Sequence, residues 1–188
     1  MTNEIPWRIC VLGATGSGKT TLARRIAHRL EIPCIELDAL HWGPDWTPFP
    51  LERVRAETAR AVKGDAWVVD GGHGTVREIV WPRAELVVWL DYSLPLILWR
   101  TIRRTLHRCV VREELWNGNR ETFRRAFLSR KSVILFALRR HWGSRRECTS
   151  LLKRPEYHHL TIVRLRSPRS TEAWLAKHEE DSRGYSCS

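Results

Sequence analysis

The residues best suited to chemistry form one loop, Gly13-Ala14-Thr15-Gly16-Ser17-Gly18-Lys19-Thr20. This run fits the pattern G-x-x-x-x-G-K-[ST], whose glycines let backbone N–H groups approach a polyphosphate that a Cβ would push away. Lys19 would place a positive charge near the β- and γ-phosphates, and the Thr20 hydroxyl can ligate Mg²⁺. We therefore predict that residues 13–20, together with Thr21, bind ATP with Mg²⁺.

The surroundings of this phosphate loop support that prediction. An apolar run, residues 7–12, precedes the loop and has the character of a buried strand. Apolar residues then recur at helical spacing up to Pro33, which predicts a helix directly after the loop. A strand, a glycine loop and a helix in this order are the context that the motif requires, and the N-terminus of the helix adds partial positive charge. A glycine-rich turn that binds nothing is the alternative, and the flanking elements argue against it.

The remaining elements must position this loop. Four further apolar runs predict strands, at residues 32–37, 66–69, 86–90 and 160–165. Amphipathic patterns between and after them predict helices, at residues 51–61, 94–107, 121–142 and 171–178. Short apolar strands that alternate with helices indicate an α/β fold in three layers, with a five-stranded parallel sheet and helices on both faces. We expect one nucleotide-binding domain over residues 1–178 and a disordered polar tail over residues 179–188.

Acidic residues stand at the ends of three of these strands. Asp38 follows the second strand and Asp70 the third, and ligands bind at the carboxyl ends of parallel strands. Both residues should therefore share a crevice with the phosphate loop. Asp91 follows the fourth strand and, with Ser93, is well placed to cap the next helix, so we interpret it as structural.

A loop rich in aromatic residues and proline, residues 41–50, comes directly after Asp38. Trp42 and its neighbours could form the floor for a planar acceptor molecule, or they could make a rigid loop packed on the core. The sequence leaves both interpretations open.

Positive charge is concentrated in one segment. Residues 100–146 hold 14 of the 32 Lys and Arg but 3 of the 21 Asp and Glu, so this segment carries the whole net charge of +11. Such a segment can be a solvated face, a nucleic-acid footprint or a clamp for phosphoryl groups. Phosphoryl transfer gives a reason for the charge, because arginines stabilise the transition state while a closing lid excludes water.

Composition also indicates the cellular compartment of the protein. The 5 cysteines are scattered without C-x-x-C spacing, which favours a reducing cytoplasm over a disulfide framework or a zinc site. We find no apolar stretch long enough to cross a membrane and no signal-peptide pattern at the N-terminus, so we expect a cytoplasmic protein without a membrane partner. The sequence does not indicate an oligomeric state.

Several stretches resemble the nucleoside-monophosphate-kinase-like branch of the P-loop NTPases, and more closely the bacterial DNA topology-modulation or adenylate-kinase-like proteins. The narrowest of them is Glu114-Leu115-Trp116-Asn117-Gly118-Asn119-Arg120-Glu121. The others are residues 13–20, 35–42, 67–71, 88–92 and 165–168. The resemblance implies a five-stranded P-loop NTPase fold, an acceptor-binding segment after the second strand, and an arginine-bearing lid, here a basic helical lid at about 100–146. It also implies that Asp70 holds the Mg²⁺ shell together with Thr20.

The resemblance extends the candidate site to the acceptor and the lid. Asp70-Gly71 resembles the Asp-Gly of adenylate kinases, but the arginine that follows there is displaced here to Arg77. We expect Asp38, Trp42 and Arg77 to line the acceptor pocket, with or without an Asp38–Arg77 salt bridge. In the lid, Arg112, Arg120 and Arg124 flank an Asn-Gly-Asn turn at which it would hinge. Arg120 joins Lys19 and Asp38 as a catalytic candidate, and Arg112 and Arg124 are candidates for contact with the acceptor.

The acceptor itself can be of two kinds. A phosphate monoester is already an anionic nucleophile at pH 7, because its second pKa is ~6, and it needs cations rather than a base. A hydroxyl acceptor needs a carboxylate that takes its proton, which Asp38 could supply. We favour a kinase that transfers the γ-phosphate of ATP to a nucleotide-like or other small acceptor. A DNA-associated ATPase, and a nucleotide-binding protein that transfers nothing, are the alternatives.

Overall fold

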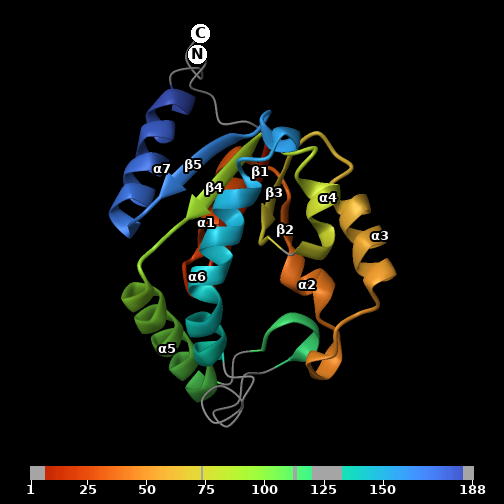
Figure 1. The fold of residues 1–188 in the computed structure, drawn as a ribbon, viewed down its shortest axis with the longest axis vertical. Coiled ribbons are helices and arrows are strands. Elements are labelled where there is room, and N and C mark those ends of the chain that lie inside the picture. The colour runs from red at the N-terminus through yellow and green to blue at the C-terminus, as the bar shows by residue number, and fades with distance from the viewer. Residues whose placement is uncertain (1–6, 73, 112–113, 120–132, 184–188) are drawn as a thin grey trace.

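The computed structural model describes residues 7–72, 74–111, 114–119 and 133–183 (Figure 1). The strands are β1 (Arg8–Gly13), β2 (Cys34–Glu36), β3 (Trp67–Asp70), β4 (Leu86–Leu90) and β5 (Thr161–Leu165). The helices are α1 (Lys19–Leu30), α2 (Leu37–His41), α3 (Leu51–Ala61), α4 (Arg77–Val80), α5 (Leu94–Val111), α6 (Val133–Leu151) and α7 (Pro168–Arg183). Short 3₁₀ turns lie at η1 (Pro44–Trp46), η2 (Gly74–Val76), η3 (Trp116–Gly118) and η5 (Pro155–Tyr157).

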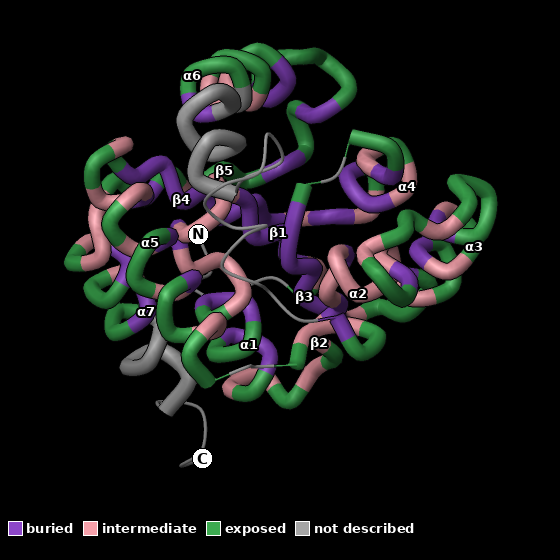
Figure 2. Tube along the Cα trace, turned by 90° about the horizontal axis from the view of Figure 1, so that it is seen from below, coloured by how far each residue is buried: buried purple, intermediate pink, exposed green. Residues whose placement is uncertain are grey.

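The five strands form one parallel sheet, as the sequence predicted, and their order is β2-β3-β1-β4-β5. Alternate side chains of each strand point to opposite faces. Cys10 and Val87 therefore join a core under α3 and α4, whereas Ile9 and Val88 join a second core under α1 and α7. With both faces covered, the strands can be apolar throughout, which explains their continuous hydrophobic runs. The result is three layers of helix, sheet and helix (Figures 1 and 2).

The central strand β1 is paired on both sides, and this pairing fixes the end of the sheet at which a ligand can bind. Val11 lies opposite Asp70 of β3, and Gly13 lies opposite Leu90 of β4. Because all strands run in the same direction, the phosphate loop, Asp70 and Asp91 emerge at one edge. Figure 2 looks onto this edge, around which α1, α2, α4, α5 and α6 are arranged.

Some element boundaries differ from the predicted ones. The second strand ends at Glu36 rather than at residue 37, so that Asp38 lies in the first turn of α2. The short helices α2 and α4 were not predicted, because four or five residues show too little periodicity. In the lid segment, α5 extends to Val111 and α6 to Leu151, and the two helices pack against each other.

The last helix extends into the first five residues of the tail that we expected over residues 179–188. Helix α7 continues to Arg183 instead of ending near His178. Polar residues do not end a helix by themselves, and no glycine or proline interrupts the chain between Pro168 and Gly184. Residues 184–188 lie outside the described part. Among the helices that the structure describes, none combines the length and the apolar character needed to cross a membrane.

Candidate active site

The phosphate loop connects the end of β1 to the start of α1, and its backbone depends on two glycines. Gly16 and Gly18 have φ angles of 83° and 94°, a left-handed conformation that side chains with a Cβ rarely adopt. Space is limiting as well, since a Cβ on Gly16 would lie 2.1 Å from the Thr101 hydroxyl oxygen. Gly18 caps α1, so the free N–H groups of that helix face the loop. The loop thus has the geometry that favours an anion at a helix N-terminus.

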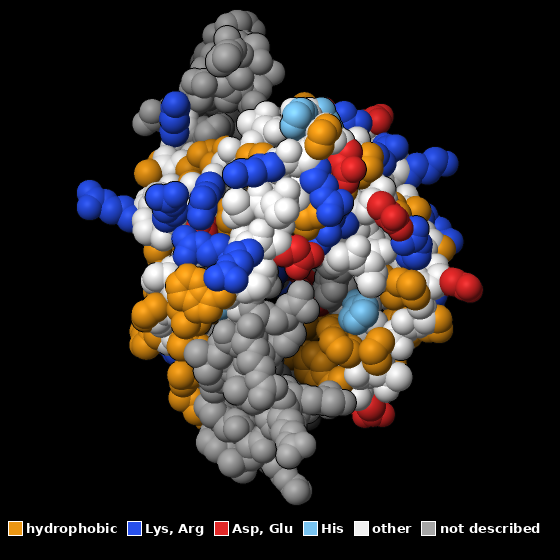
Figure 3. Space-filling view, in the orientation of Figure 1, with side chains coloured by type: hydrophobic (Ala, Val, Ile, Leu, Met, Phe, Trp, Pro, Cys, Tyr) orange, Lys and Arg blue, Asp and Glu red, His pale blue; other side chains and the backbone are white. Residues whose placement is uncertain are grey.

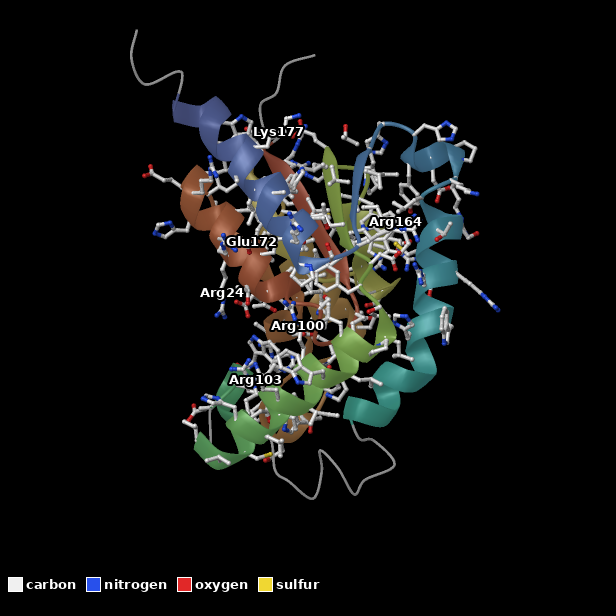
Figure 4. All side chains as sticks on the ribbon, turned by 90° about the vertical axis from the view of Figure 1, so that its left-hand side faces the viewer. Arg24, Arg100, Arg103, Arg164, Glu172 and Lys177 are labelled. Carbon is white, nitrogen blue, oxygen red and sulfur yellow. The ribbon has the colours of Figure 1, made fainter. Side chains whose placement is uncertain are left out.

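Helix α5 supports the loop from outside the motif. The Arg100 guanidinium donates to the Ser17 carbonyl oxygen at 3.1 Å, and the buried Thr101 hydroxyl donates to the Thr15 carbonyl oxygen at 3.3 Å. Figure 4 shows Arg100 between the first turns of α5 and the start of α1, with Arg103 farther along α5. No local sequence signal indicates these contacts, because nothing in the loop motif specifies which helix packs behind it. At least one cation of the basic segment therefore positions the loop.

A close pair joins the loop to β3. The Thr20 hydroxyl donates to Asp70 Oδ2 at 2.5 Å. Asp70 is buried, and its other oxygen, Oδ1, has no hydrogen-bond partner among the described residues. A hydroxyl oxygen and an unpaired carboxylate oxygen are hard donors of the kind that Mg²⁺ takes. The two residues predicted to hold the metal are thus brought together, and they fit it.

The electrostatic environment of Asp70 involves four neighbours. Burial raises the pKa of Asp70, whereas the positive charge of Lys19 and the hydrogen bond from Thr20 lower it. The negative charges of Asp38 and Glu36 raise this pKa further. Lys19, Asp38 and Asp70 therefore lie within electrostatic range of one another at the carboxyl ends of β1, β2 and β3. The positions of these residues at strand ends thus bring them near one another.

Glu36 is a connecting residue that the sequence analysis missed. Its carboxylate accepts hydrogen bonds from Arg24 Nε of α1 at 2.7 Å and from Trp116 Nε1 of η3 at 2.8 Å. Glu36 thereby connects the helix behind the phosphate loop to the Trp-Asn-Gly-Asn turn. Its position at the end of β2, two residues before Asp38, was the available signal.

The same turn fixes the loop that contains Trp42. The side-chain amide of Asn119 donates to the Gly43 carbonyl oxygen at 2.8 Å, and its oxygen accepts from the Trp46 N–H at 2.7 Å. Asn117 donates to the Trp42 carbonyl oxygen, and its φ of 56° explains why asparagine suits the position. The turn at which we expected a lid to hinge is thus anchored on this loop, and the Trp42 and Trp46 rings meet edge to face at 5.9 Å.

A cavity of about 210 Å³ lies beside the phosphate loop, between α4 and α6. Its walls include Gly13 and Ala14 of the loop and several polar groups. These groups are Arg77, Asp91, His141, Arg145 and Glu147. Arg77 therefore lines a pocket, but Asp38 and Trp42 are not among its walls. Of the three expected acceptor residues, Arg77 lies on the cavity wall, whereas Asp38 lies in α2 and Trp42 at the end of that helix.

Arg77 does not form the salt bridge with Asp38 that the sequence left open. Its guanidinium donates to Glu147 Oε1 of α6 at 3.0 Å and lies over the Trp81 ring, 5.3 Å from the ring centroid. This ion pair joins α4 to α6 across the cavity. Cys148 lies on the same wall, and burial raises the pKa of its thiol to about 12, so that it is not a nucleophile at neutral pH.

Asp91 has a structural role, as we expected, but as the partner of two arginines rather than as a helix cap. Helix α5 begins three residues later, at Leu94, and the buried Asp91 Oδ2 instead accepts from Arg145 at 2.8 Å and from Arg164 at 2.8 and 2.5 Å. A buried carboxylate requires such partners because its desolvation is costly. The partners come from α6 and β5, a long-range pairing that no local pattern indicates. Figure 4 shows Arg164 at the junction of β5 and α6.

Three predicted lid arginines, Arg112, Arg120 and Arg124, lie outside the described residues, as does His73. Thr21 is exposed on α1, and Thr20 and Lys19 begin that helix. Of the predicted site, the structure thus brings together the phosphate loop, Asp38 and Asp70. Figure 3 shows basic side chains across the middle of the face that α6 covers, with acidic side chains among them.

Comparisons with known proteins agree with this geometry. Residues 9–76 match the family described as ATPase family associated with various cellular activities (AAA). No curated protein sequence matches the chain. Among solved structures, the shikimate kinase of Bacteroides thetaiotaomicron superposes with a TM-score of 0.55 at 16% identity, over 94% of this chain and 98% of that one.

Two further structures give lower scores. The shikimate kinase of Acinetobacter baumannii in complex with shikimate has a TM-score of 0.48 at 17% identity, with 97% and 96% of the two chains covered. A gluconokinase of Sinorhizobium meliloti has a TM-score of 0.48 at 20% identity, with 96% and 97% covered. The sheet order, the loop and the first of these likenesses show the fold, which is an α/β P-loop kinase-like fold.

Proposed function

We propose that this protein is an ATP- and Mg²⁺-dependent phosphotransferase that acts on a small acceptor. The observation that carries the proposal is the Thr20–Asp70 pair, in which a buried carboxylate oxygen has no partner among the described residues and lies within range of Lys19. A site that holds a metal there would present it to phosphates bound by the loop. A separate polar cavity on the other side of Gly13 and Ala14 offers space for a second substrate.

The chain's own residues would divide the work as follows. The loop N–H groups and Lys19 hold the β- and γ-phosphates, and Thr20 and Asp70 hold the metal. Mg²⁺, when bound, neutralises the charge that develops on the transferred group and on the departing ADP. An oxygen of the acceptor forms a bond to the γ-phosphorus as the bond between this phosphorus and the bridging oxygen of ADP breaks. Arg120, with Arg112 and Arg124, would close over the transferred group from the lid.

The role of Asp38 depends on the acceptor. For a hydroxyl acceptor, the Asp38 carboxylate takes the hydroxyl proton as the bond to phosphorus forms. For a phosphate acceptor no base is needed, and Asp38 orients the acceptor instead. We favour a nucleotide-like or other phosphorylated acceptor, because the cavity beside the loop presents two arginines, Arg77 and Arg145. The anchored loop at Trp42 then bounds the α2 side of the crevice.

The fold supports this function without naming the acceptor. The shikimate kinase whose fold the chain shares is a small-molecule kinase by name. The Trp-Asn-Gly-Asn run also supports a narrower proposal, that the chain belongs to the bacterial topology-modulation or adenylate-kinase-like branch. In the structure, Trp116 of this run donates to Glu36, and Asn119 donates to the Gly43 carbonyl oxygen in the loop that contains Trp42.

An ATPase that grips DNA through residues 100–146 is the competing function. Among the described arginines of that segment, Arg100 and Arg145 bind groups of the protein itself, the Ser17 carbonyl oxygen and the Asp91 carboxylate. Part of the positive charge thus positions the site, which favours the kinase. The competing function still makes a distinct prediction, that DNA affinity falls steeply between about 50 and 200 mM salt as counterions are released.

An ATP-consumption screen tests the proposal. Purified protein is supplied with ATP and Mg²⁺ and with nucleotides, sugars, small hydroxy acids and DNA in separate reactions. We expect one small acceptor to stimulate ADP formation and to become phosphorylated, whereas DNA has no effect. Lys19→Ala should be inactive, and Lys177→Ala, which removes an exposed lysine on α7, should match wild type. Stimulation by DNA in the absence of any phosphorylated product would contradict the proposal.

A further inference from the structure

The walls of the cavity between α4 and α6 hold two arginines, Arg77 and Arg145, and two carboxylates, Asp91 and Glu147. Asp91 is shared between Arg145 and a second arginine, Arg164, which is not among the walls. Glu147 pairs with Arg77, and its side chain is 48% exposed, so that water weakens its negative field. The two carboxylates therefore offset the field of the two wall arginines only in part, which favours an anion in the cavity.

Arg145 has N–H donors available for such an anion. Its Nη2 atom donates to Asp91, and its other N–H donors have no hydrogen-bond partner among the described residues. A guanidinium has five N–H donors in a planar fork that suits a carboxylate or a phosphate. Asp91 holds this fork in place from the floor of the cavity.

His141 is the second independent observation. It lies one helical turn before Arg145 on α6, its side chain is buried, and its Nε2 atom has no partner among the described residues. Buried polar atoms are nearly always hydrogen-bonded, so an atom without a partner on a cavity wall points to a missing ligand atom. Burial lowers the pKa of His141, the charge of Arg145 lowers it further, and Asp91 opposes both. The ring is therefore neutral at pH 7 and can accept or donate one hydrogen bond at Nε2.

We propose that this cavity binds the anionic end of the acceptor, with Arg145 and Arg77 neutralising its charge and His141 Nε2 hydrogen-bonding one of its oxygens. The shared chemistry is a compact oxyanion, either a phosphate monoester or a carboxylate. The proposal rests on the proposed function, since it identifies where that reaction's second substrate is held. It also limits the size of the substrate, because about 210 Å³ is less than the ~300–1,000 Å³ of pockets that enclose drug-sized ligands. The cavity thus takes one end of the acceptor or a small metabolite.

Nuclear magnetic resonance of the histidine ring nitrogens tests this proposal without ATP. Protein labelled with ¹⁵N-histidine is titrated with inorganic phosphate and, separately, with acetate at constant pH and ionic strength. The His141 signals are assigned by their loss in His141→Gln. The titrations are run in a Lys19→Ala background as well, because the phosphate loop also attracts anions. We expect a saturable shift of the His141 signals in both backgrounds.

Two arginine variants distinguish the cavity from general charge. Arg145→Gln removes the fork while Arg164 still pairs with Asp91, and Arg146→Gln removes the exposed neighbouring arginine of the same helix. Arg145→Gln should weaken the anion's Kd about tenfold or more, and Arg146→Gln should leave it unchanged. A stronger response to phosphate identifies a phosphorylated acceptor, and a stronger response to acetate identifies a carboxylate.

The outcomes separate this proposal from the proposed function. If phosphate and acetate leave the His141 signals in place, or if Arg145→Gln binds the anion as tightly as wild type, the cavity is not an anion site. A native amide spectrum of each variant ensures that a lost response does not reflect unfolding. If His141 responds but no acceptor stimulates ATP consumption, the anion site stands and the kinase proposal falls. If an acceptor is phosphorylated but the His141 signals do not shift, the kinase proposal stands and the anion site is rejected.

Discussion

The Thr20 hydroxyl oxygen and Asp70 Oδ2 lie 2.5 Å apart, although fifty residues separate them in the chain. The contact exists because β1 and β3 are neighbours in the sheet, which brings the start of α1 beside the end of β3. The other Asp70 oxygen is buried without a described partner. The folded protein therefore holds a carboxylate whose charge costs stability, and a bound cation would remove that cost.

Replacement of this carboxylate should stabilise the protein and inactivate it. The folded-state pKa of Asp70 is raised above 3.8, so this group makes the fold less stable as pH rises above 3.8 through the folded-state pKa. Asp70→Asn keeps the acceptor for Thr20 and removes the charge. We expect its Tm at pH 7, without nucleotide and metal, to exceed that of wild type by about 2–4 °C for each 1 kcal/mol gained. Thermal unfolding at pH 7 and at lower pH measures this difference, which should shrink in acid; a lower Tm at pH 7 would contradict it.

Loss of the loop lysine should affect ATP affinity far more than folding. Lys19 is half-exposed, and its replacement leaves no cavity in the core. In Lys19→Ala we expect ATP binding to be lost in calorimetry, with the free energy of unfolding within about 0.5 kcal/mol of wild type. Equal ATP affinity of the two proteins would show that the loop is not the nucleotide site.

The kinetics of an Asp38 variant should distinguish the two kinds of acceptor. If Asp38 takes a proton from a hydroxyl, Asp38→Asn should lower kcat by about 10²–10⁴-fold with little change in ATP affinity. If Asp38 orients a phosphorylated acceptor, as we favour, the loss should appear mainly in the acceptor KM. Steady-state kinetics with the acceptor found in the screen gives this split. Normal activity per folded molecule, together with easier unfolding, would remove Asp38 from the site.

Asn119 should matter more for stability than Asn117, although both lie in the same turn. Asn119 is buried and serves both the Gly43 carbonyl oxygen and the Trp46 N–H, whereas Asn117 is exposed. Asn119→Ala leaves buried polar groups without partners, at a cost of about 1–3 kcal/mol for each unsatisfied group. Urea unfolding should therefore show a larger loss for Asn119→Ala than for the matched Asn117→Ala. Equal losses would mean that the anchoring is not energetically significant.

The buried histidine of the cavity, His141, should make the stability of the folded protein depend on pH. The folded-state pKa of His141 lies below 6.5, so the stability that the neutral ring contributes is present above pH 6.5 and is lost as pH falls toward the folded-state pKa. Burial is the largest cause of the lowered pKa, Arg145 of the same helix lowers it further, and Asp91 at the end of β4 raises it. In His141→Gln this loss should be absent, so the stability of wild type relative to the variant should decrease below pH 6.5. A difference that is constant between pH 8 and 5 would contradict this assignment.

The sequence predicted those parts of the structure that local patterns encode. Apolar runs placed all five strands, and the glycine loop with its flanking elements placed the phosphate site. Residues at strand ends predicted the proximity of Asp38 and Asp70, because parallel strands leave their carboxyl ends at one edge. Arg77, by contrast, donates to Glu147 of α6, and Asp91 accepts from Arg145 and Arg164. These partners are far away in the chain, and no periodicity or spacing relates them.

The same limit explains why Glu36 and His141 were missed. From the sequence alone, a carboxylate on a strand and a histidine on a basic helix are both expected to be exposed to solvent. In the folded protein, Trp116 donates to Glu36, and packing buries His141. Their roles depend on which elements become neighbours, and this is a property of the whole fold. Local sequence thus predicts the phosphate loop better than the long-range contacts of Glu36, Arg77, Asp91 and His141.

The tight contact between Gly16 and Thr101 has a consequence for motion. An added Cβ at Gly16 would lie 3.0 Å from the Ile97 carbonyl oxygen as well as against Thr101, so the loop backbone packs directly on the first turns of α5. The two segments should therefore open to solvent as one cooperative unit, and their amide hydrogens should exchange at correlated rates. A ligand that slows exchange in the loop will also slow it in α5, even though that helix need not touch the ligand.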